Sequence, residues 1–239
     1  MQSLTQALEP SDFAIGEILG EGKFGIVWEA QQVLSQRHCA LKLFKKDESV
    51  SHVLEMAEFL DEINVLKVLD PSFPFIVRYD GFLADHPVKG IALELVTGGT
   101  LLDKVTNTGP LREPDARFYI SDGHIKLTDF GLATFLTHKL PNSPVGALYI
   151  RPPEMFLGKP YGYEADWYSL GVALYEIVTG YPPFVGCECP IHMHLPDSYC
   201  LRDCIRLITL EVEINYPTHL SKDCQNLLRL LMSKHPTHR

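Results

Sequence analysis

The sequence predicts an α+β fold made of an antiparallel sheet with one helix, followed by a mainly helical part. Residues 13–43 contain short β-branched and apolar segments broken by glycines, which is typical of strands. Apolar residues at helical spacing follow at 53–69, and two more strand-like segments lie at 76–83 and 89–96. Because strands and helices do not alternate, the order favours an antiparallel sheet over a parallel one.

The second half of the chain is predicted to be mainly helical. Residues 164–179 are strongly apolar, as expected for a buried helix. Residues 221–235 form an amphipathic pattern that begins at Ser221, a favourable helix N-cap. These patterns predict a helical lobe that follows the strand-rich one.

We divide the chain into three parts on these grounds. Residues 1–12, with the turn-forming Pro10 and Ser11, are predicted to be a leader. The strand-rich lobe is predicted to cover 13–96, and the helical lobe is predicted to cover 97–239.

Composition and charge limit the classes of partner. Of the 239 residues, 46% are hydrophobic and 21% are charged, which is the balance of a folded globular protein. The formal net charge of -9 argues against nucleic acid or an anionic membrane as the main partner. A local basic site for phosphate groups is compatible with that charge.

The chain is expected to be intracellular, in the cytoplasm or the nucleus. No apolar run reaches the length that crosses a bilayer. The N-terminal sequence has neither a basic start nor an apolar core, so it does not predict a secretory signal. The six cysteines are therefore interpreted as reduced thiols.

A glycine-rich motif, Gly-Glu-Gly-Lys-Phe-Gly-Ile-Val, occupies residues 20–27. Glycines at this spacing let backbone N–H groups approach phosphates closely, and two different folds use the pattern. Here strand-forming residues, rather than a helix, follow the last glycine. The context favours a strand–turn–strand flap over ATP, and the plain alternative is a glycine-rich hairpin.

Lys42 ends an apolar, strand-like segment, Cys-Ala-Leu-Lys. A lysine in such a place is costly to bury unless a negative group pairs with it. ATP phosphates would pair it on one side, and Glu62, within the predicted helix at 53–69, would pair it on the other. The alternative is an exposed lysine on an edge strand.

Asp129-Phe130-Gly131 follows a predicted strand at 124–127. A carboxylate on a tight glycine turn is a good ligand for Mg²⁺, which prefers oxygen. The sequence therefore predicts Asp129 as a metal ligand, and the alternative is a hairpin turn that happens to contain an aspartate.

Further motifs follow in order, and together they are specific. They are Pro152-Pro153-Glu154, Asp166-Trp167-Tyr168-Ser169-Leu170-Gly171, Pro182-Pro183-Phe184 and His235-Pro236-Thr237-His238-Arg239. With the motifs above, they make the chain resemble a eukaryotic protein kinase of the Ser/Thr type, with an AGC-like character, over residues 13–239. The resemblance implies a bilobal fold, with ATP bound beneath a strand-rich N-lobe and with a mainly helical C-lobe.

The resemblance also implies roles for individual residues. Lys42, held by Glu62, would contact the α- and β-phosphates of ATP, and Asp129 would bind Mg²⁺. In the C-lobe, Glu154 would pair with Arg239. The implied activity is transfer of the γ-phosphate to serine or threonine of a protein substrate. The other residues expected to bind the ATP cofactor are Leu19, Gly20, Glu21, Gly22, Gly25, Val27, Ala40, Leu93, Glu94 and Val96.

The chain departs from the family where the catalytic base should lie. The family places an H-R-D-x-x-x-x-N loop before the Mg²⁺ aspartate. Here a helical sequence runs through Ile120 directly into Ser121 and the Asp129 motif, so that about thirty family residues are missing. The C-lobe also ends before its last expected helices. The missing segment should leave apolar surface exposed on the helix at 164–179.

Two further features carry less weight. Ala147 stands where Ser/Thr members usually have a threonine that contacts the catalytic aspartate. Cysteines and histidines also lie close together in one stretch, at Cys187, Cys189, His192, His194, Cys200 and Cys204. Their spacing matches no familiar zinc pattern, so ordinary thiols are favoured over a metal site.

Three interpretations stay open at this point. The chain is an active Ser/Thr kinase in which another group replaces the base, a catalytically dead pseudokinase that binds Mg–ATP as a scaffold, or a splice or deletion product without function. The abrupt join of Ile120 to Ser121 favours the third, because gradual decay usually substitutes motif residues and keeps length. The expected partner is a protein substrate or a scaffold partner, and the oligomeric state is open.

Overall fold

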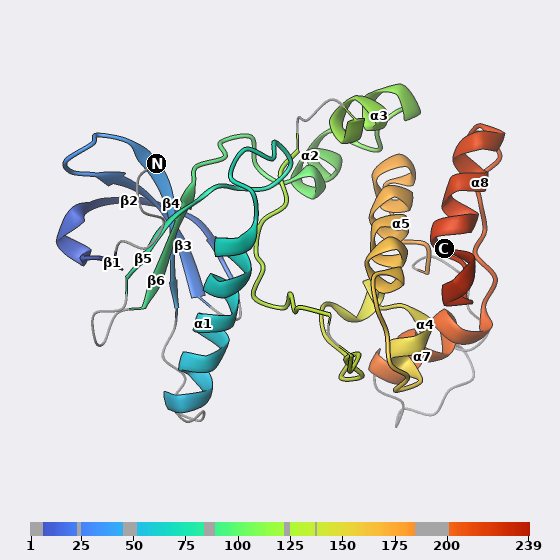
Figure 1. Ribbon diagram of the computed structural model, residues 1–239. Coiled ribbons are helices and arrows are strands. Elements are labelled where there is room, and N and C mark those ends of the chain that lie inside the picture. The colour runs from blue at the N-terminus through green and yellow to red at the C-terminus, as the bar shows by residue number, and fades with distance from the viewer. Residues whose placement is uncertain are drawn as a thin grey trace. The chain divides into compact units, whose positions relative to one another are not determined.

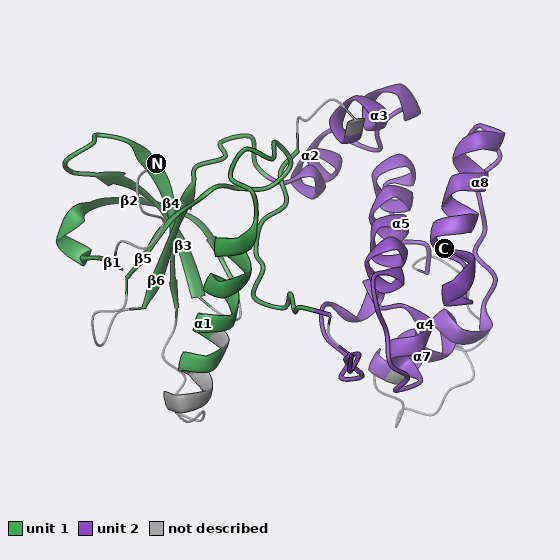
Figure 2. Cartoon of the chain, in the orientation of Figure 1, with its two compact units in different colours: residues 1–99, 123–135 green, residues 100–122, 136–239 purple. Residues whose placement is uncertain are grey.

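The computed structural model describes residues 7–22, 25–44, 52–83, 89–121, 125–136, 138–184 and 201–239 (Figure 1). The chain divides into two compact units (Figure 2). The first contains residues 1–99 and 123–135, and the second contains residues 100–122 and 136–239. The segment 123–135 thus clusters with the sheet, although the chain enters it from the helical unit.

The first unit is built on a six-stranded sheet. Its strands are β1 (Ala7–Leu8), β2 (Phe13–Glu21), β3 (Gly25–Gln32), β4 (His38–Phe44), β5 (Tyr79–Leu83) and β6 (Gly90–Glu94), in the spatial order β1-β5-β6-β4-β3-β2. All neighbouring strands are antiparallel except β1 and β5, which are parallel. The strands β2 to β6 confirm the predicted antiparallel sheet and the α+β class. β1 and the 3-10 helix η1 (Pro10–Asp12) precede them.

The two faces of the sheet carry separate cores. Helix α1 (His52–Val68) packs on one face, which buries Phe59, Ile63, Leu66, Val77, Tyr79, Ile91 and Leu93. The opposite face buries Phe13, Ala30, Cys39, Leu41, Leu83 and Ala92. Side chains alternate along a strand, so Leu41 points to the second face and Lys42 to the face of α1.

The chain between α1 and β5 differs from the prediction. The strand predicted at 76–83 begins only at Tyr79. Ile76 instead forms a parallel bridge with Leu127, and the Val77 N–H donates to the Leu127 carbonyl at 3.0 Å. The backbone of residues 76–77 therefore pairs with the segment around Leu127 and does not extend β5. A strand was also predicted at 124–127. Its described residues, 125–127, form this single bridge.

The second unit is helical, as predicted. Its helices are α2 (Leu101–Thr108), α3 (Glu113–Ser121), η2 (Leu148–Ile150), α4 (Pro153–Phe156), α5 (Glu164–Thr179), α7 (Leu201–Glu211), α8 (Lys222–Leu231) and η3 (Pro236–His238). α5 supplies much of the core through Tyr168, Val172 and Tyr175. The Ser221 hydroxyl accepts the Cys224 N–H at 3.1 Å, which confirms Ser221 as the N-cap of α8.

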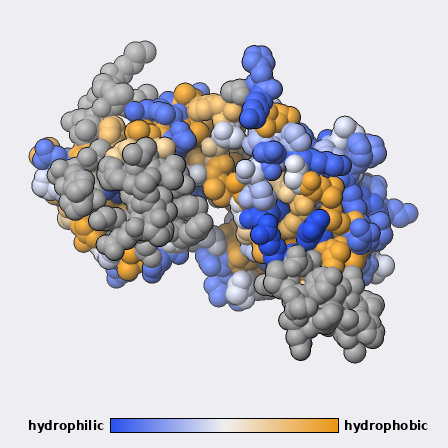
Figure 3. Space-filling model, turned by 90° about the horizontal axis from the view of Figure 1, so that it is seen from below, coloured by the Kyte–Doolittle hydropathy of each residue, from blue (hydrophilic) through white to orange (hydrophobic). Residues whose placement is uncertain are grey.

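Helix α5 keeps part of its apolar surface exposed. Trp167 is 52% exposed and Leu170 is 37% exposed, as the sequence predicts for a helix that lacks a covering segment. Apolar surface is visible on both units in Figure 3. Among the described helices, none combines the length and the apolar character needed to cross a bilayer.

Candidate functional site

Lys42 lies at the centre of a buried ion cluster in the first unit. Its ammonium donates hydrogen bonds of 2.8 and 2.9 Å to the two carboxylate oxygens of Glu62 and one of 2.8 Å to Asp129 Oδ1. Lys42 is 7% exposed and Glu62 is 2% exposed. Lys42 is therefore not the exposed edge lysine of the alternative interpretation, because β4 lies between β6 and β3.

The three charged groups differ in their access to water. Burial raises the pKa of Glu62, and the hydrogen bond from Lys42 opposes that rise. The Asp129 side chain, in contrast, is 65% exposed. One lysine does not neutralise two carboxylates, so the cluster carries excess negative charge on its exposed side. Such a carboxylate suits a hard cation from solvent.

Asp129 occupies a constrained turn. Its φ of 64° lies in the left-handed region, which is uncommon for a residue other than glycine. The next N–H, from Phe130, donates to the Glu62 carboxylate. The Phe130 ring packs against the core on the α1 face. A Cβ at Gly131 would lie 3.1 Å from Glu62 Oε2. The turn is therefore held closely against Glu62.

The glycine-rich segment contains glycines of two kinds. A Cβ at Gly25 would lie 2.2 Å from the Leu43 carbonyl oxygen, so strand packing requires a glycine there. A Cβ at Gly20 or Gly22 would meet nothing within 4 Å among the described residues. Packing therefore does not explain Gly20 and Gly22, and a ligand close to their backbone would. Lys23 and Phe24 lie outside the described residues.

Strand register places three of the other predicted ATP residues, Val27, Ala40 and Leu93, on the same face of the sheet as Lys42. Val27 is paired with Lys42, and Ala40 is paired with Leu93. Directly paired residues share a face, and so do residues two apart in one strand. Leu93 is buried, whereas Val27 and Ala40 are half-buried. Leu19 and Glu21, at the end of β2, are exposed.

Glu94 ends β6 and is fixed on several sides. Its N–H donates to the Arg78 carbonyl at 2.8 Å, and its carboxylate accepts the Arg78 N–H at 3.1 Å. Lys126 Nζ donates to the same carboxylate oxygen at 2.9 Å. Burial alone would raise the pKa of Glu94, but these hydrogen bonds leave it below its ordinary value. Val96, two residues further on, is 45% exposed.

The contact between Lys126 and Glu94 was not predicted from the sequence. The two residues are 32 positions apart, and no local pattern connects them. The direct contact of Lys42 with Asp129, 87 positions apart, was not predicted either. Both depend on the return of segment 125–135 to the first unit.

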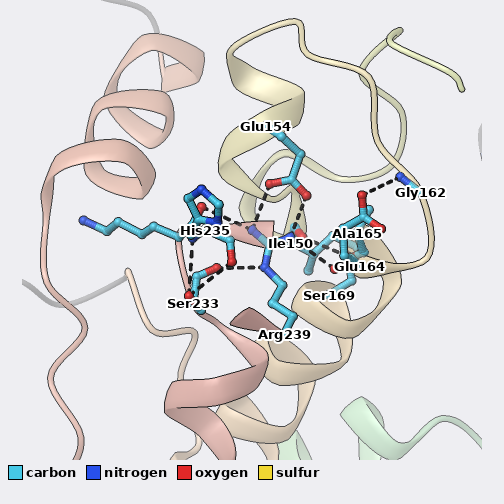
Figure 4. A network of polar contacts seen from close by, with 10 residues as sticks. Ile150, Glu154, Gly162, Glu164, Ala165, Ser169, Ser233, His235 and Arg239 are labelled. Atoms are coloured by element: carbon cyan, nitrogen blue, oxygen red, sulfur yellow. Dashed lines mark hydrogen bonds and ion pairs between the residues drawn. The ribbon is translucent and has the colours of Figure 1, made fainter. Parts of the chain in front are cut away.

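The second unit contains a separate buried ion pair (Figure 4). Arg239 Nη2 donates to Glu154 Oε2 at 2.8 Å, and its Nε donates to the Ser233 carbonyl at 2.7 Å. Nη1 also donates to the Glu164 carbonyl at 3.1 Å. The guanidinium lies over the Tyr168 ring, 4.9 Å from its centroid. The structure therefore forms the Glu154–Arg239 contact that the resemblance to protein kinases implies.

Two carboxylates near the missing loop already have partners. Asp115 accepts hydrogen bonds of 2.8 and 3.1 Å from Arg112. Glu113 accepts the Ser221 N–H and hydroxyl, both at 2.6 Å. Asp122 lies outside the described residues. Both described carboxylates therefore already accept two hydrogen bonds each.

The remaining predicted features are only partly described. Five of the six clustered cysteines and histidines lie outside the described residues, and the sixth, Cys204, is buried. In the described part of the chain, no group of three or more His, Cys, Asp or Glu side chains could hold a metal ion. Ala147 directly precedes η2, and Asp166 is exposed on α5.

Comparison with known families gives one result. The family described as "Protein kinase domain" matches residues 13–123 and 118–239, in two segments that overlap at the end of α3. Together they cover nearly the whole chain.

Individual relatives include three kinases. The chain is 29% identical to serine/threonine-protein kinase AtPK1/AtPK6 of Arabidopsis thaliana, over 95% of this chain and 52% of that protein. It is 30% identical to serine/threonine-protein kinase AtPK2/AtPK19 of the same plant, over 95% of this chain and 51% of that protein. It is 28% identical to cAMP-dependent protein kinase type 3 of Saccharomyces cerevisiae, over 94% of this chain and 59% of that protein. The chain thus spans about half the length of these relatives.

Proposed function

Because the chain belongs to the protein kinase family, we propose that it binds Mg–ATP in its first unit. Its reaction class is transfer of the γ-phosphoryl group to serine or threonine of a protein. The observation that carries the proposal is the ion cluster in which Lys42 joins the buried Glu62 to the exposed Asp129.

The donor groups of the cluster suit a nucleotide and its metal. Lys42, held by Glu62, would hold phosphate oxygens, because its ammonium is fixed by hydrogen bonds to two carboxylates. Asp129 would hold Mg²⁺ through its exposed carboxylate. Mg–ATP, when bound, would supply the phosphoryl group that is transferred. These residues bind and orient the nucleotide, which is the larger part of what kinases contribute.

Two other observations support a nucleotide at this face of the sheet. Among the described residues, no atom lies within 4 Å of where a side chain at Gly20 or Gly22 would be, which favours access of phosphates to their backbone. The half-buried Val27 and Ala40 lie beside the buried Leu93 and offer an apolar surface to a base.

The chain lacks the family's H-R-D-x-x-x-x-N loop between the end of β6 and Asp129. The comparisons support the loss of a segment there. The family matches in two pieces that meet near Ile120 and Ser121. The alignment with AtPK1/AtPK6 spans 260 residues, whereas 95% of 239 residues is about 227, so about 33 aligned positions have no residue in this chain.

The second candidate function is a nucleotide-binding scaffold without transfer activity. The missing base favours it, because a positioned general base contributes about 10²–10⁴-fold to a rate. We therefore expect phosphoryl transfer by this chain to be slower than that of its relatives by at least that factor.

A titration and a transfer assay test the proposal together. Mg–ATP is titrated calorimetrically into the parent chain, into Lys42→Met and into Lys159→Met, which changes an exposed lysine of the second unit. We expect binding by the parent and by Lys159→Met, and a large loss of affinity in Lys42→Met. Equal binding by all three variants, or binding by none, would contradict the proposed site.

The transfer assay separates the two candidate functions. Labelled ATP and a mixed library of serine and threonine peptides are incubated with the parent and with Lys42→Met. A slow rate in the parent that Lys42→Met abolishes supports residual kinase activity. Equal background in both, together with nucleotide binding by the parent, supports the scaffold.

We also propose a protein partner, as a substrate or as a scaffold partner, and a location in the cytoplasm or nucleus. The net charge of -9 supports a protein over nucleic acid or an anionic membrane. The location is proposed because the sequence predicts no secretory signal. Co-purification from fractionated cells, followed by identification of the bound proteins, tests both statements.

A further inference from the structure

The segment that carries Asp129 is attached to the first unit by its backbone. The Leu127 N–H donates to the Phe75 carbonyl at 2.7 Å, and the Leu127 carbonyl accepts the Val77 N–H at 3.0 Å. This segment belongs to the same compact unit as the sheet, as the green parts of Figure 2 show. Asp129 is therefore positioned by groups of the first unit.

Lys126, the residue before Leu127, also attaches the segment to the first unit through an ion pair with Glu94. Its Nζ lies 2.9 Å from Glu94 Oε2, and the two side chains are 27% and 24% exposed. Glu94 is itself held to Arg78 by two hydrogen bonds, one through its backbone and one through its carboxylate. Lys126 is thus anchored to a rigid point at the end of β6.

The spacing of these attachments limits how the segment can move. Lys126 and Asp129 are three residues apart, a reach of about 10 Å in extended chain. Leu127 is paired between them, and Asp129 has the unfavourable φ of 64°. A strained residue keeps such a conformation only when its surroundings fix it. Loss of the Lys126 anchor would leave Asp129 with fewer constraints on its position.

We propose that Lys126 is a positioning residue for the nucleotide site. Through Glu94, it fixes the place of Asp129 relative to β6, and it thereby sets the affinity for the phosphate and metal part of Mg–ATP. The inference rests on the proposed function, in which Asp129 holds Mg²⁺.

A merely structural ion pair predicts a different result. A partly exposed pair of this kind stabilises a fold modestly, and its loss would weaken every ligand of the unit alike. A positioning role predicts selective loss, because adenosine has neither the phosphates nor the metal that Lys42 and Asp129 would hold. The ratio of the two affinities therefore separates the explanations.

The test is calorimetric titration of Mg–ATP and of adenosine into the parent, Lys126→Met and Lys126→Arg. Lys126→Met is expected to weaken Mg–ATP binding about two- to fivefold, the range of a partly exposed pair, and to leave adenosine binding unchanged. Lys126→Arg keeps the positive charge and should restore the parent affinity. In a Glu94→Gln background, Lys126→Met should have no further effect.

The control is Lys159→Met, which should match the parent for both ligands, and thermal melts verify that each variant is folded. Equal Mg–ATP affinity in the parent and Lys126→Met overturns the inference, and so does an equal loss for both ligands. If the parent binds adenosine but not Mg–ATP, or binds neither, the proposed function fails and the inference fails with it.

Discussion

The two units each bury an ion cluster, and the clusters differ in the exposure of their charged side chains to solvent. In the second unit, the Arg239 side chain is 0% exposed and the Glu154 side chain is 3% exposed. The remaining donors of Arg239 bind backbone carbonyls, and its guanidinium lies over Tyr168. In the first unit, Lys42 and Glu62 are buried as deeply, but the third member, Asp129, is 65% exposed.

The difference separates a structural role from a functional one. A closed cluster, such as that of Arg239, pairs its charged groups within the protein and leaves none exposed for a ligand. A cluster with one exposed, excess carboxylate can accept a cation without breaking its buried pair. We therefore interpret the Arg239 cluster as stabilising the helical unit, and the Lys42 cluster stays the proposed ligand-binding site.

The largest expected effect is the loss of the closed cluster. Arg239→Met leaves the Glu154 carboxylate buried without its partner, which costs about 3–5 kcal/mol. Chemical denaturation should show that loss in the transition of the second unit. Arg206→Met, at an exposed position on α7, is the matched control and should change little. A loss below about 1 kcal/mol for Arg239→Met would contradict the structural assignment.

Loss of the Lys42 cluster is expected to destabilise the first unit by an amount that depends on pH. Burial raises the folded-state pKa of Glu62, so its contribution to stability is present below the unfolded pKa and is lost as pH rises through the folded pKa. Lys42→Met removes the hydrogen bond that opposes this rise. The destabilisation by Lys42→Met should therefore grow as pH rises through the raised folded-state pKa that Glu62 has in the parent, by about 1.4 kcal/mol for each further unit of pKa shift.

Denaturation of the parent and Lys42→Met at several pH values measures this difference. Lys159→Met serves as the control at each pH, since it changes an exposed lysine. A destabilisation that is constant with pH would show that Glu62 does not respond to the loss of Lys42.

Substitutions of Gly25 and Gly22 measure the effects of packing and of ligand binding separately within the first unit. Gly25→Ala places a methyl group 2.2 Å from the Leu43 carbonyl oxygen, and it should cost about 1–3 kcal/mol of unfolding free energy. Gly22→Ala meets nothing among the described residues, so stability should stay within about 0.5 kcal/mol. Mg–ATP affinity, however, should fall in Gly22→Ala. Unchanged affinity in a folded Gly22→Ala would remove this glycine from the proposed site.

The smallest expected effect concerns the contact between α3 and α8. Ser221→Ala removes the N-cap of α8 and the hydroxyl contact with Glu113, and it keeps the backbone N–H contact, for a loss of about 1 kcal/mol. Glu113→Gln should account for part of the same loss, and the double variant should cost less than the sum. Strict additivity would mean that the cap and the contact are independent.

Local patterns predicted most of the elements. Glycines, β-branched residues and helical spacing located the strands β2 to β6 and the helices α1, α5 and α8, and Ser221 marked the start of α8. The strand predicted at 76–83 was placed too early, because residues 76–77 bond to Leu127 instead. That pairing depends on a segment about fifty residues further along the chain, which no local pattern reveals.

The candidate site shows the same limit. The sequence predicts that Lys42 meets Glu62, and the resemblance to protein kinases implies that Glu154 meets Arg239. The structure forms both contacts. The sequence does not predict that Lys42 also bonds to Asp129 or that Lys126 bonds to Glu94. These contacts follow from the path of the returning segment, which is set by tertiary packing. The functional roles of these residues stay predictions.

The most direct test of the comparison is thermal unfolding at increasing Mg–ATP, with the parent, Lys42→Met and Lys159→Met side by side. A ligand that binds only the folded state raises stability by about 2.7 kcal/mol at a hundred times its Kd. The account predicts a cooperative transition that Mg–ATP raises in the parent and in Lys159→Met, and that it does not raise in Lys42→Met. A parent transition that Mg–ATP leaves unmoved, or an equal rise in all three variants, would contradict the assignment of the Lys42 cluster to ligand binding.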